Sequence, residues 1–296
     1  MLKGIDTSHF SNFNLQQLVE MVRTNKLYFN FIKATEGGTI QDTKFIQIWQ
    51  MSRSAGLVCS AYHFFRPLAD AAAQASNFIT QYKKVSRAGV LPPVVDLEWA
   101  ITKINGKPVD QWTQLLPNER IPKIKAFLSA LETEFKMKPI IYTAPSFWKE
   151  LINDQSSTTD NAYFADFPLW LVDLKQLGRV PIPWQGKVAP FTQTHFGENA
   201  TTQDLFDLSD QNEFNGDLKG ILNRTLPGFT IMKGFPFSNI VVDLQAKLIE
   251  GNFLNGNADG LFGNNTETAV NAFQKANDFF ENGIIDAQTW NKLLSS

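Results

Sequence analysis

The stretch LPPVVDLEW, residues 91–99, decides the fold that we expect for this chain. Val94 and Leu97 suit a buried strand, and the two prolines suit its start, where the hydrogen-bonded ladder has not yet begun. Side chains alternate along a strand, so Asp96 and Glu98 project from one face with Cα atoms about 6.6 Å apart. Two unpartnered acids inside an apolar core would cost several kcal/mol each. We therefore expect this face to open on a polar cleft at the strand end.

Neighbouring carboxylates of this kind suit acid–base chemistry on an acetal. Repulsion between them raises the pKa of one acid, which keeps a proton for a leaving oxygen. The other acid stays ionised and stabilises a cationic centre. The residues alone leave a second interpretation open, in which the pair is an ion-paired strand end without chemistry.

Short apolar runs alternate with amphipathic segments over the first two thirds of the chain. We expect strands at residues 2–6, 28–34, 57–65, 94–98, 139–143, 169–173 and 187–194, and helices at 14–24, 42–55, 69–84 and 121–136. This alternation predicts an α/β protein with a parallel sheet, closed into a barrel related to the (β/α)₈ type. Such barrels place active sites at the carboxyl ends of their strands, where Asp6, Asp96 and Glu98 fall. Residues 100–117 and 153–167 are interpreted as loops.

The composition argues against several classes of protein. A formal net charge of −2 and a pI near 6.0 lack the basic field of a nucleic-acid binder, so we expect no nucleic-acid partner. Cys59 is the only cysteine, and the three histidines show no zinc-binding spacing, so we expect neither a metal nor a cofactor. The chain has no long apolar run and no secretory signal pattern, which predicts no membrane insertion.

The pattern changes after Gly220. Residues 222–238 carry Pro227, Gly228 and further Gly and Pro without helical periodicity, and are interpreted as a linker. The remaining tail fits three helices and contains a repeat, because DGLF at 259–262 with Thr266 recurs as NGII at 282–285 with Thr289. This tail has no acid–base pair of its own, so binding is the better prediction for it than catalysis.

Six segments carry motifs of one known family. They are GIDTS at 4–8, FIKATEG at 31–37, AYHF at 61–64, VVDLE at 94–98, IYT at 141–143 followed by FW at 147–148, and LW at 169–170. In this order they resemble glycoside hydrolase family 25, the Chalaropsis-type lysozymes. These are N-acetylmuramidases that cut the β-1,4 bond between N-acetylmuramic acid and N-acetylglucosamine in peptidoglycan. The resemblance covers about residues 2–221 and implies an irregular TIM-like β/α barrel.

The resemblance also implies roles for individual residues. Glu98 matches the general acid, Asp96 matches the carboxylate that stabilises positive charge or positions the sugar's N-acetyl group, and Asp6 matches the acid on the first strand. Tyr62, Tyr142 and Trp170 match aromatic residues that line the cleft. Asp210, which opens the motif DQNEFNG at 210–216, is a further cleft residue. Asp6 and Asp210 could instead only anchor backbone at strand ends, and the acid spacing suits either retention or inversion.

The tail resembles a peptidoglycan-binding module with the signature DGxxGxxTxxAVxxFQ, present here at residues 259–274. We therefore predict a muramidase barrel at 1–221, a linker at 222–238 and a wall-binding helical module at 239–296. Bacterial peptidoglycan would be the partner of both domains, and we expect a monomer. Phe10-Ser11, where the family often has Gln-Gly, and Asp173, where an aromatic is common, leave the fine substrate preference open.

The sequence leaves two alternative functions open and also predicts where the protein acts. The protein could bind walls without cleaving them, or it could be a glycosidase that acts on chitin-like polymers. Without a signal peptide it would be made in the cytosol, and it would reach the periplasm or cell wall by holin-type release or another export route.

Overall fold

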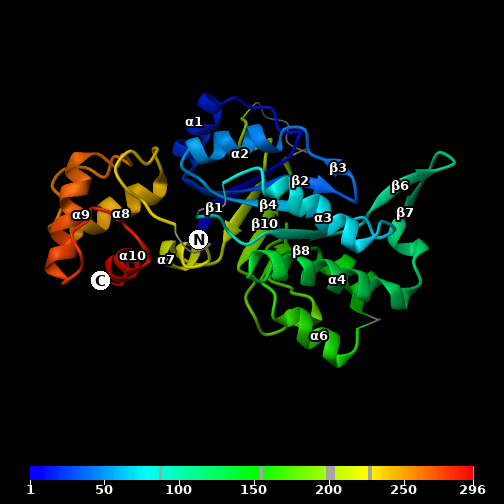
Figure 1. Cartoon of the computed structure of the whole chain (residues 1–296). Coiled ribbons are helices and arrows are strands. Elements are labelled where there is room, and N and C mark those ends of the chain that lie inside the picture. Colours follow the sequence, from blue (N-terminus) through cyan, green and yellow to red (C-terminus); the bar gives the residue numbers. More distant parts are fainter. Residues whose placement is uncertain (87–88, 154–155, 198–203, 226–228, 296) are drawn as a thin grey trace.

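The structure, a computed structural model, describes residues 1–86, 89–153, 156–197, 204–225 and 229–295 (Figure 1). Within these residues, eight strands close a barrel in the order β1-β11-β10-β9-β8-β5-β4-β2, and β2 pairs with β1. All neighbours are parallel except the two pairs that β11 makes with β1 and β10. The strands are β1 (Leu2–Thr7), β2 (Leu27–Glu36), β4 (Val58–Phe64), β5 (Val94–Leu97), β8 (Ile140–Thr143), β9 (Leu169–Val172), β10 (Phe191–His195) and β11 (Asp210–Phe214).

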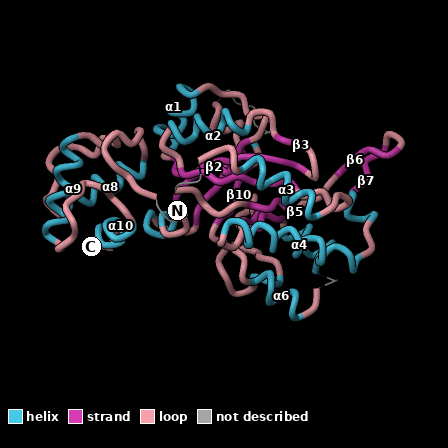
Figure 2. The backbone as a smooth tube through the Cα atoms, viewed as in Figure 1, coloured by secondary structure: helices cyan, strands magenta, loops and turns pink. Residues whose placement is uncertain are grey.

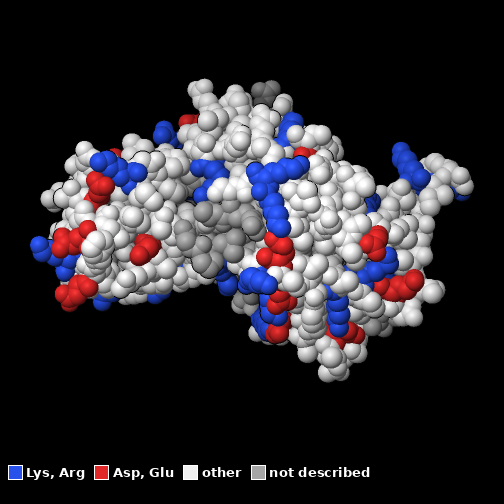
Figure 3. Space-filling model, viewed as in Figure 1, with Lys and Arg blue, Asp and Glu red and all other residues white. Residues whose placement is uncertain are grey.

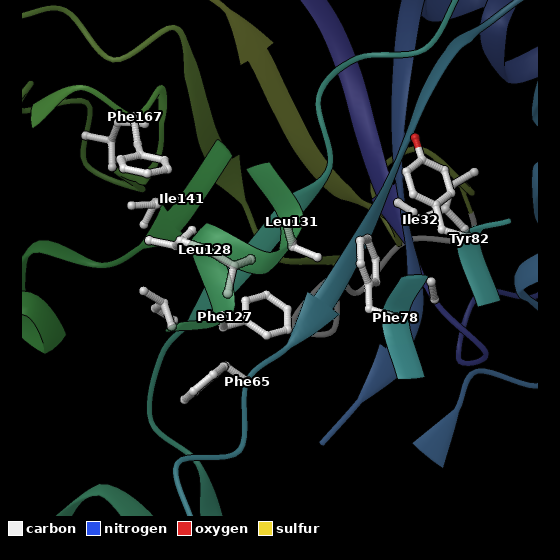
Figure 4. Close-up of a cluster of buried hydrophobic side chains, with 14 of the residues drawn as sticks. Ile32, Phe65, Phe78, Tyr82, Phe127, Leu128, Leu131, Ile141 and Phe167 are labelled. Carbon is white, nitrogen blue, oxygen red and sulfur yellow. The ribbon is translucent and has the colours of Figure 1, made fainter. Parts of the chain in front are cut away.

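Helices cover the outside of the barrel (Figure 2). They are α1 (Leu15–Asn25), α2 (Phe45–Ser54), α3 (Ala71–Tyr82), α4 (Pro117–Phe135), α5 (Pro145–Phe147) and α6 (Thr158–Ala165), with short turns η1 (Gln111–Gln114), η2 (Trp148–Ile152) and η4 (Ile182–Trp184). Phe78 on α3 and Phe127 and Leu131 on α4 belong to one buried cluster with Ile32 and Ile141 of the strands (Figure 4). Each such side chain contributes about 1.5–3 kcal/mol when it leaves water, so this layer holds the helices on the sheet.

The sequence predicted most of these elements. All seven expected strands and all four expected helices are present, with small differences at their ends. The expected loop at 100–117 was wrong, because β6 (Ile101–Ile104) and β7 (Lys107–Asp110) form a hairpin that projects from the body (Figure 1). The loop at 153–167 was also wrong, because it contains α6; residues 154–155 lie outside the described part. Strand β11 and the two-residue β3 (Ile40–Gln41) were not expected.

The barrel interior changes from apolar to polar along its axis. Near the amino ends of the parallel strands, which we call the barrel floor, Phe29, Phe31, Phe191 and Phe214 pack ring against ring at 5.0–5.4 Å. Gly4 on β1 makes room for this cluster, since a Cβ atom there would lie 2.5 Å from the Phe29 ring. The inward positions nearer the carboxyl ends are polar, so the phenylalanine cluster separates them from the floor.

The C-terminal module contains α8 (Asn239–Glu250), α9 (Asn264–Ala276) and α10 (Ala287–Leu293). Its sequence repeat is a structural repeat around two buried glutamines. The Gln245 side-chain amide donates to Asp259 Oδ1, the Leu261 carbonyl and Thr266 Oγ1. The Gln274 amide donates to the equivalent atoms of Asn282, Ile284 and Thr289. Each glutamine thus closes the loop that follows its helix.

The module packs on the barrel floor. The Asn239 amide donates to the carbonyls of Val22 and Leu27 at 2.9 Å, and the Tyr28 hydroxyl donates to Asp243 Oδ2 at 2.8 Å. One buried apolar cluster continues from the phenylalanines inside the barrel through α7 (Leu218–Leu222) to α8, α9 and α10. In Figure 1 the module lies beside the amino-terminal strand and α7.

Part of the segment expected to be a linker also contacts the floor. Gly56 and Gly89, at floor turns, have φ of +76° and +65°. A Cβ atom on Gly56 would lie 2.1 Å from the Phe237 carbonyl oxygen, and one on Gly89 would lie 1.9 Å from the Phe229 ring. Pro227 and Gly228 lie outside the described residues. The division of the chain into 1–221, 222–238 and 239–296 stays a prediction.

No helix in the described ranges has the length and apolar composition needed to cross a bilayer. On the face shown in Figure 3, basic and acidic side chains lie interspersed over the surface rather than in fields of one sign.

His63 points outward from β4 into the helix layer and is fully buried. Its Nδ1 lies 2.7 Å from Thr35 Oγ1, and its Nε2 lies 3.1 Å from Gln74 Oε1. The amide oxygen is an acceptor only, so Nε2 carries the hydrogen and Nδ1 accepts from the threonine hydroxyl. Burial lowers the pKa of His63 to about 4, with a further contribution from Lys33, so the ring is neutral in the fold.

Because the pKa of His63 is lowered in the fold, we expect the free energy of unfolding to decrease at acid pH. The folded pKa of about 4 lies below the usual histidine value of 6.5, so the neutral His63 ring favours the folded state above pH 6.5, and this stability is lost as pH falls toward 4. Between pH 7 and pH 4 the wild type should lose about 3 kcal/mol more of its free energy of unfolding than His63→Gln. Urea unfolding at a series of pH values measures this difference, and parallel stability curves would contradict it.

Candidate active site

Four acids meet at the carboxyl end of the barrel. Asp96 lies on β5 and Glu98 directly follows it, while Asp6 on β1 pairs in register with Asp210 on β11. The charges of Glu98 and Asp6 both raise the pKa of Asp96, and those of Asp210 and Glu98 raise the pKa of Asp6. The structure therefore brings together the four acidic residues that the sequence singled out.

Asp96 is the deepest member of the predicted pair. It is 6 % exposed, and burial, followed by the Glu98 charge, raises its pKa well above the usual range. Lys33, which points inward from β2, acts in the opposite direction. The resemblance gives the acid role to Glu98, and two interacting acids titrate as a pair, so a proton taken up here belongs to the pair and not to one residue. Glu98 is the more exposed of the two and is closer to a substrate's reach.

One oxygen of Asp96 lacks a partner in the described part of the structure. Its Oδ1 is buried and forms no hydrogen bond there. A buried acceptor without a donor costs about 1–3 kcal/mol. This atom is therefore a candidate acceptor for a donor that a substrate would bring.

Asp6 differs from Asp96 because two amides hold it. Burial and then the Asp210 charge raise the pKa of Asp6 well above its usual range. Hydrogen bonds from Asn212 Nδ2 at 2.8 Å and Gln193 Nε2 at 2.9 Å lower the pKa and offset part of this rise. Asp210 has a different partner, since its Oδ1 accepts the Gly197 amide hydrogen at 2.8 Å.

The three predicted cleft aromatics form one side of the site. Trp170 lies 4.5 Å from Tyr142 and 6.4 Å from Tyr62, measured between ring centroids. Tyr142 and Trp170 are only 6 % and 2 % exposed, and their polar atoms bond to Gln193 and Asn212. Burial and the nearby acids raise the pKa of the Tyr62 and Tyr142 hydroxyls. Contact between substrate and Tyr62, Tyr142, Trp170 or Asp210 stays a prediction.

The segment that follows the acid pair, made of the β6–β7 hairpin and η1, fixes the backbone of the pair. Trp112 is fully buried, and its indole N–H donates to the Glu98 carbonyl oxygen at 2.8 Å. Asp110 Oδ1 accepts the amide hydrogens of Ala100 and Trp112. Trp112 is thus an anchor for the loop rather than a surface for a sugar.

A cationic pair borders the acids. Lys33 Nζ lies 2.8 Å from Glu36 Oε2, and Arg66 Nη2 lies 2.6 Å from Glu36 Oε1. Burial alone would raise the pKa of Glu36, but these two cations outweigh it, so the pKa is lowered and the group is ionised. Glu36 therefore holds the Lys33 side chain through this ion pair.

Sequence reasoning missed Gln193 and Asn212. Both are almost fully buried and contact Asp6 directly. A signal was present in DQNEFNG, because alternation along a strand would have placed Asp210 and Asn212 on the same face. In the described residues no group of histidine, cysteine and acidic side chains is arranged to hold a metal ion.

The module has a hollow of its own. A cavity of about 520 Å³ lies between α8, α9 and α10. Its walls are Lys247, Glu250, Gly251, Phe253, Phe273, Ala276, Asn277, Lys292 and Leu293. Two lysines, one acid and two aromatic rings thus surround a space that can take part of a polar ligand.

Comparison with known proteins agrees with this geometry. The family model described as "Glycosyl hydrolases family 25" matches residues 5–192, more than half of the chain, and the chain belongs to this family. A second model, "Putative peptidoglycan binding domain", matches residues 238–293.

Individual relatives match part of the chain. The Escherichia coli K12 protein "Uncharacterized protein YegX" is 32% identical over 177 residues, which are 59% of this chain and 57% of that protein. Lysozyme M1 of Streptomyces globisporus is 36% identical over 100 residues, 33% of each chain. The crystal structure of a lysozyme from Streptomyces coelicolor superposes with a TM-score of 0.61 and 26% identity, covering 76% of this chain and 96% of that one. The chain thus spans little more than half of the YegX length.

Proposed function

We propose that this protein hydrolyses peptidoglycan as an N-acetylmuramidase, cutting the β-1,4 bond between N-acetylmuramic acid and N-acetylglucosamine. The observation that carries the proposal is the Asp96–Glu98 pair, with Asp96 buried and Glu98 partly exposed, at the carboxyl end of a family 25 barrel. A proton held by the pair can pass from Glu98, its more exposed member, to the glycosidic oxygen as the bond breaks. The leaving sugar takes this proton, and a water later adds to the anomeric carbon.

The unpartnered oxygen of Asp96 supports a substrate with N-acetyl groups. Both sugars of peptidoglycan carry a 2-acetamido group, whose N–H is a donor without charge. Asp96 Oδ1, buried and without a protein donor among the described residues, suits such a group. Lys33 helps to keep Asp96 ionised once Glu98 holds the proton. In this arrangement Asp96 either stabilises the oxocarbenium-like centre or orients the acetamido oxygen toward it.

Replacing Glu98 by Gln should lower hydrolysis of purified peptidoglycan by roughly a hundred- to ten-thousandfold, because the amide cannot donate a proton as an acid does. Asp96→Asn should also be strongly impaired, since it removes the anion that faces the cation. Mass spectrometry of the wild-type digest checks the bond that is broken, and fragments ending in reducing muramic acid are the expected result.

Two outcomes would contradict the proposal. Undiminished lysis by Glu98→Gln would remove this residue from the acid role. Faster turnover of chitin than of peptidoglycan, or fragments ending in reducing glucosamine, would assign the barrel to another glycan.

We further propose that the C-terminal module binds the wall through its cavity. The family match at residues 238–293 supports peptidoglycan as the ligand. Phe273 forms an edge-to-face pair with Phe253 at 5.3 Å and is itself buried, so it supports the cavity more than it offers a ring face. Lys247 and Lys292 at the rim suit the free carboxylates of the stem peptides.

Lys292→Glu should weaken binding of the full chain to purified walls roughly tenfold, since about 1.4 kcal/mol would be lost when a favourable charge becomes repulsive. Lys275→Glu is the matched control, because Lys275 is exposed on α9 and does not line the cavity. Both variants carry the Glu98→Gln change so that walls stay intact during sedimentation. Equal binding by the two variants would exclude the cavity as the site.

A further inference from the structure

Two buried amides converge on a single oxygen of Asp6. Asn212 Nδ2 donates to Asp6 Oδ2 at 2.8 Å, and Gln193 Nε2 donates to the same oxygen at 2.9 Å. Asn212 is 1 % exposed and Gln193 is 2 % exposed, so neither amide exchanges these bonds freely with water. Asp6 Oδ1 takes no part in either bond.

Each amide is oriented by an aromatic side chain. The Trp170 indole N–H donates to Asn212 Oδ1 at 2.7 Å, and the Tyr142 hydroxyl donates to Gln193 Oε1 at 2.6 Å. Strand pairing sets these distances, because Gln193 pairs with Asn212 across β10 and β11. The result is two parallel chains of hydrogen bonds that end on Asp6.

The two series of hydrogen bonds differ in whether their donor-to-acceptor direction can reverse. An indole N–H can only donate, so Asn212 must turn its oxygen toward Trp170 and its NH₂ toward Asp6. This orientation holds whatever the charge on Asp6. A tyrosine hydroxyl can donate or accept, so the Gln193 chain could reverse if Asp6 became a donor. The tryptophan chain is therefore the one that imposes a direction.

This direction restricts where Asp6 can carry a proton. A hydrogen on Oδ2 would point at the N–H of Asn212, placing donor against donor. Oδ2 is therefore an acceptor at all times, and a proton on Asp6 can lie only on Oδ1. The charges felt by Asp6 include those of Asp210 and Glu98, the acids beside which the glycosidic bond would lie.

We propose that Trp170 and Asn212 form a one-way hydrogen-bond relay that keeps Asp6 Oδ2 an acceptor and favours the anionic form of Asp6, so that the proton of the acid cluster is directed toward the Asp96–Glu98 pair. The proposal rests on the muramidase function proposed above. In this role Trp170 and Asn212 are positioning residues, since they influence the reaction through Asp6. Tyr142 and Gln193 support the same oxygen but do not set its direction.

The relay predicts a change in pH dependence rather than only a loss of rate. Its hydrogen bonds lower the pKa of Asp6, so removing them raises this pKa. If activity needs ionised Asp6, the acid limb of kcat/KM then moves to higher pH. A hydrogen bond to a charged group corresponds to a shift of about one pH unit or more. A side chain with a purely structural role would lower activity at every pH without moving this limb.

The test uses the full chain with Trp170→Phe, Asn212→Leu and the double variant. Rates of reducing-end release from soluble peptidoglycan fragments are measured across the acid limb. We expect each single variant to move the limb upward by about one pH unit, and the double variant to move it no further, because both changes break the same relay. Asn215→Ala is the matched control, since this amide directly follows the same strand, at the end away from the acids, and donates to Ala189 O and Thr192 Oγ1.

A direct titration separates this proposal from the function. Carboxyl ¹³C NMR of Asp6 should show a higher pKa in Trp170→Phe than in the wild type, whether or not the protein cleaves peptidoglycan. An unmoved Asp6 titration, or an acid limb displaced equally by Asn215→Ala, would overturn the relay. Should Asn212→Leu not fold, Trp170→Phe, which keeps an aromatic ring in place, decides alone. A wild type that titrates as expected but releases no muramic acid end would refute the muramidase function and leave the relay standing.

Discussion

The burial of like-charged carboxylates at one end of the barrel is the constraint on which the rest of the structure depends. Asp6 and Asp96 both lie where desolvation opposes their charge, and each feels the charge of Glu98. Such a group of acids is tolerated only when cations, donors or shared protons compensate it. Here Lys33 faces Asp96 and two amides face Asp6, so each acid has its own compensation.

The apolar half of the barrel makes this polar end possible. Phe29, Phe31, Phe191 and Phe214 fill the interior below the acids and keep water from entering from the floor. Gly4 is needed for this packing, because any side chain there would overlap the Phe29 ring. The low polarity of the cluster also strengthens the electrostatic coupling above it.

Sequence patterns were sufficient to predict the strands and helices that bury mainly apolar residues. The strands with Asp96, Tyr62 and Tyr142 were predicted because apolar residues predominate in them, although His63 is among the outward side chains. Strand β11 was missed because its inward side chains include Asp210 and Asn212, which read as a turn. The acids themselves could be named from motifs, but their partners could not, since Gln193 and Asn212 reach Asp6 only when the last two strands close the barrel. The hydrogen-bond partners of glutamine and asparagine side chains cannot be predicted from the sequence alone.

The attachment of the helical module to the floor bears on how the enzyme would move over its polymer. The Asn239 and Tyr28 hydrogen bonds, with Gly56 and Gly89 closely covered by the connecting segment, join the module to the end opposite the acids. A wall held by the module and a strand held in the cleft would then be separated by a fixed length of protein. In such an enzyme the distance between the wall-binding surface and the acids is set by the height of the barrel and not by a flexible linker. While the module stays bound, the acids can then reach only glycan strands that lie at this distance from the bound one.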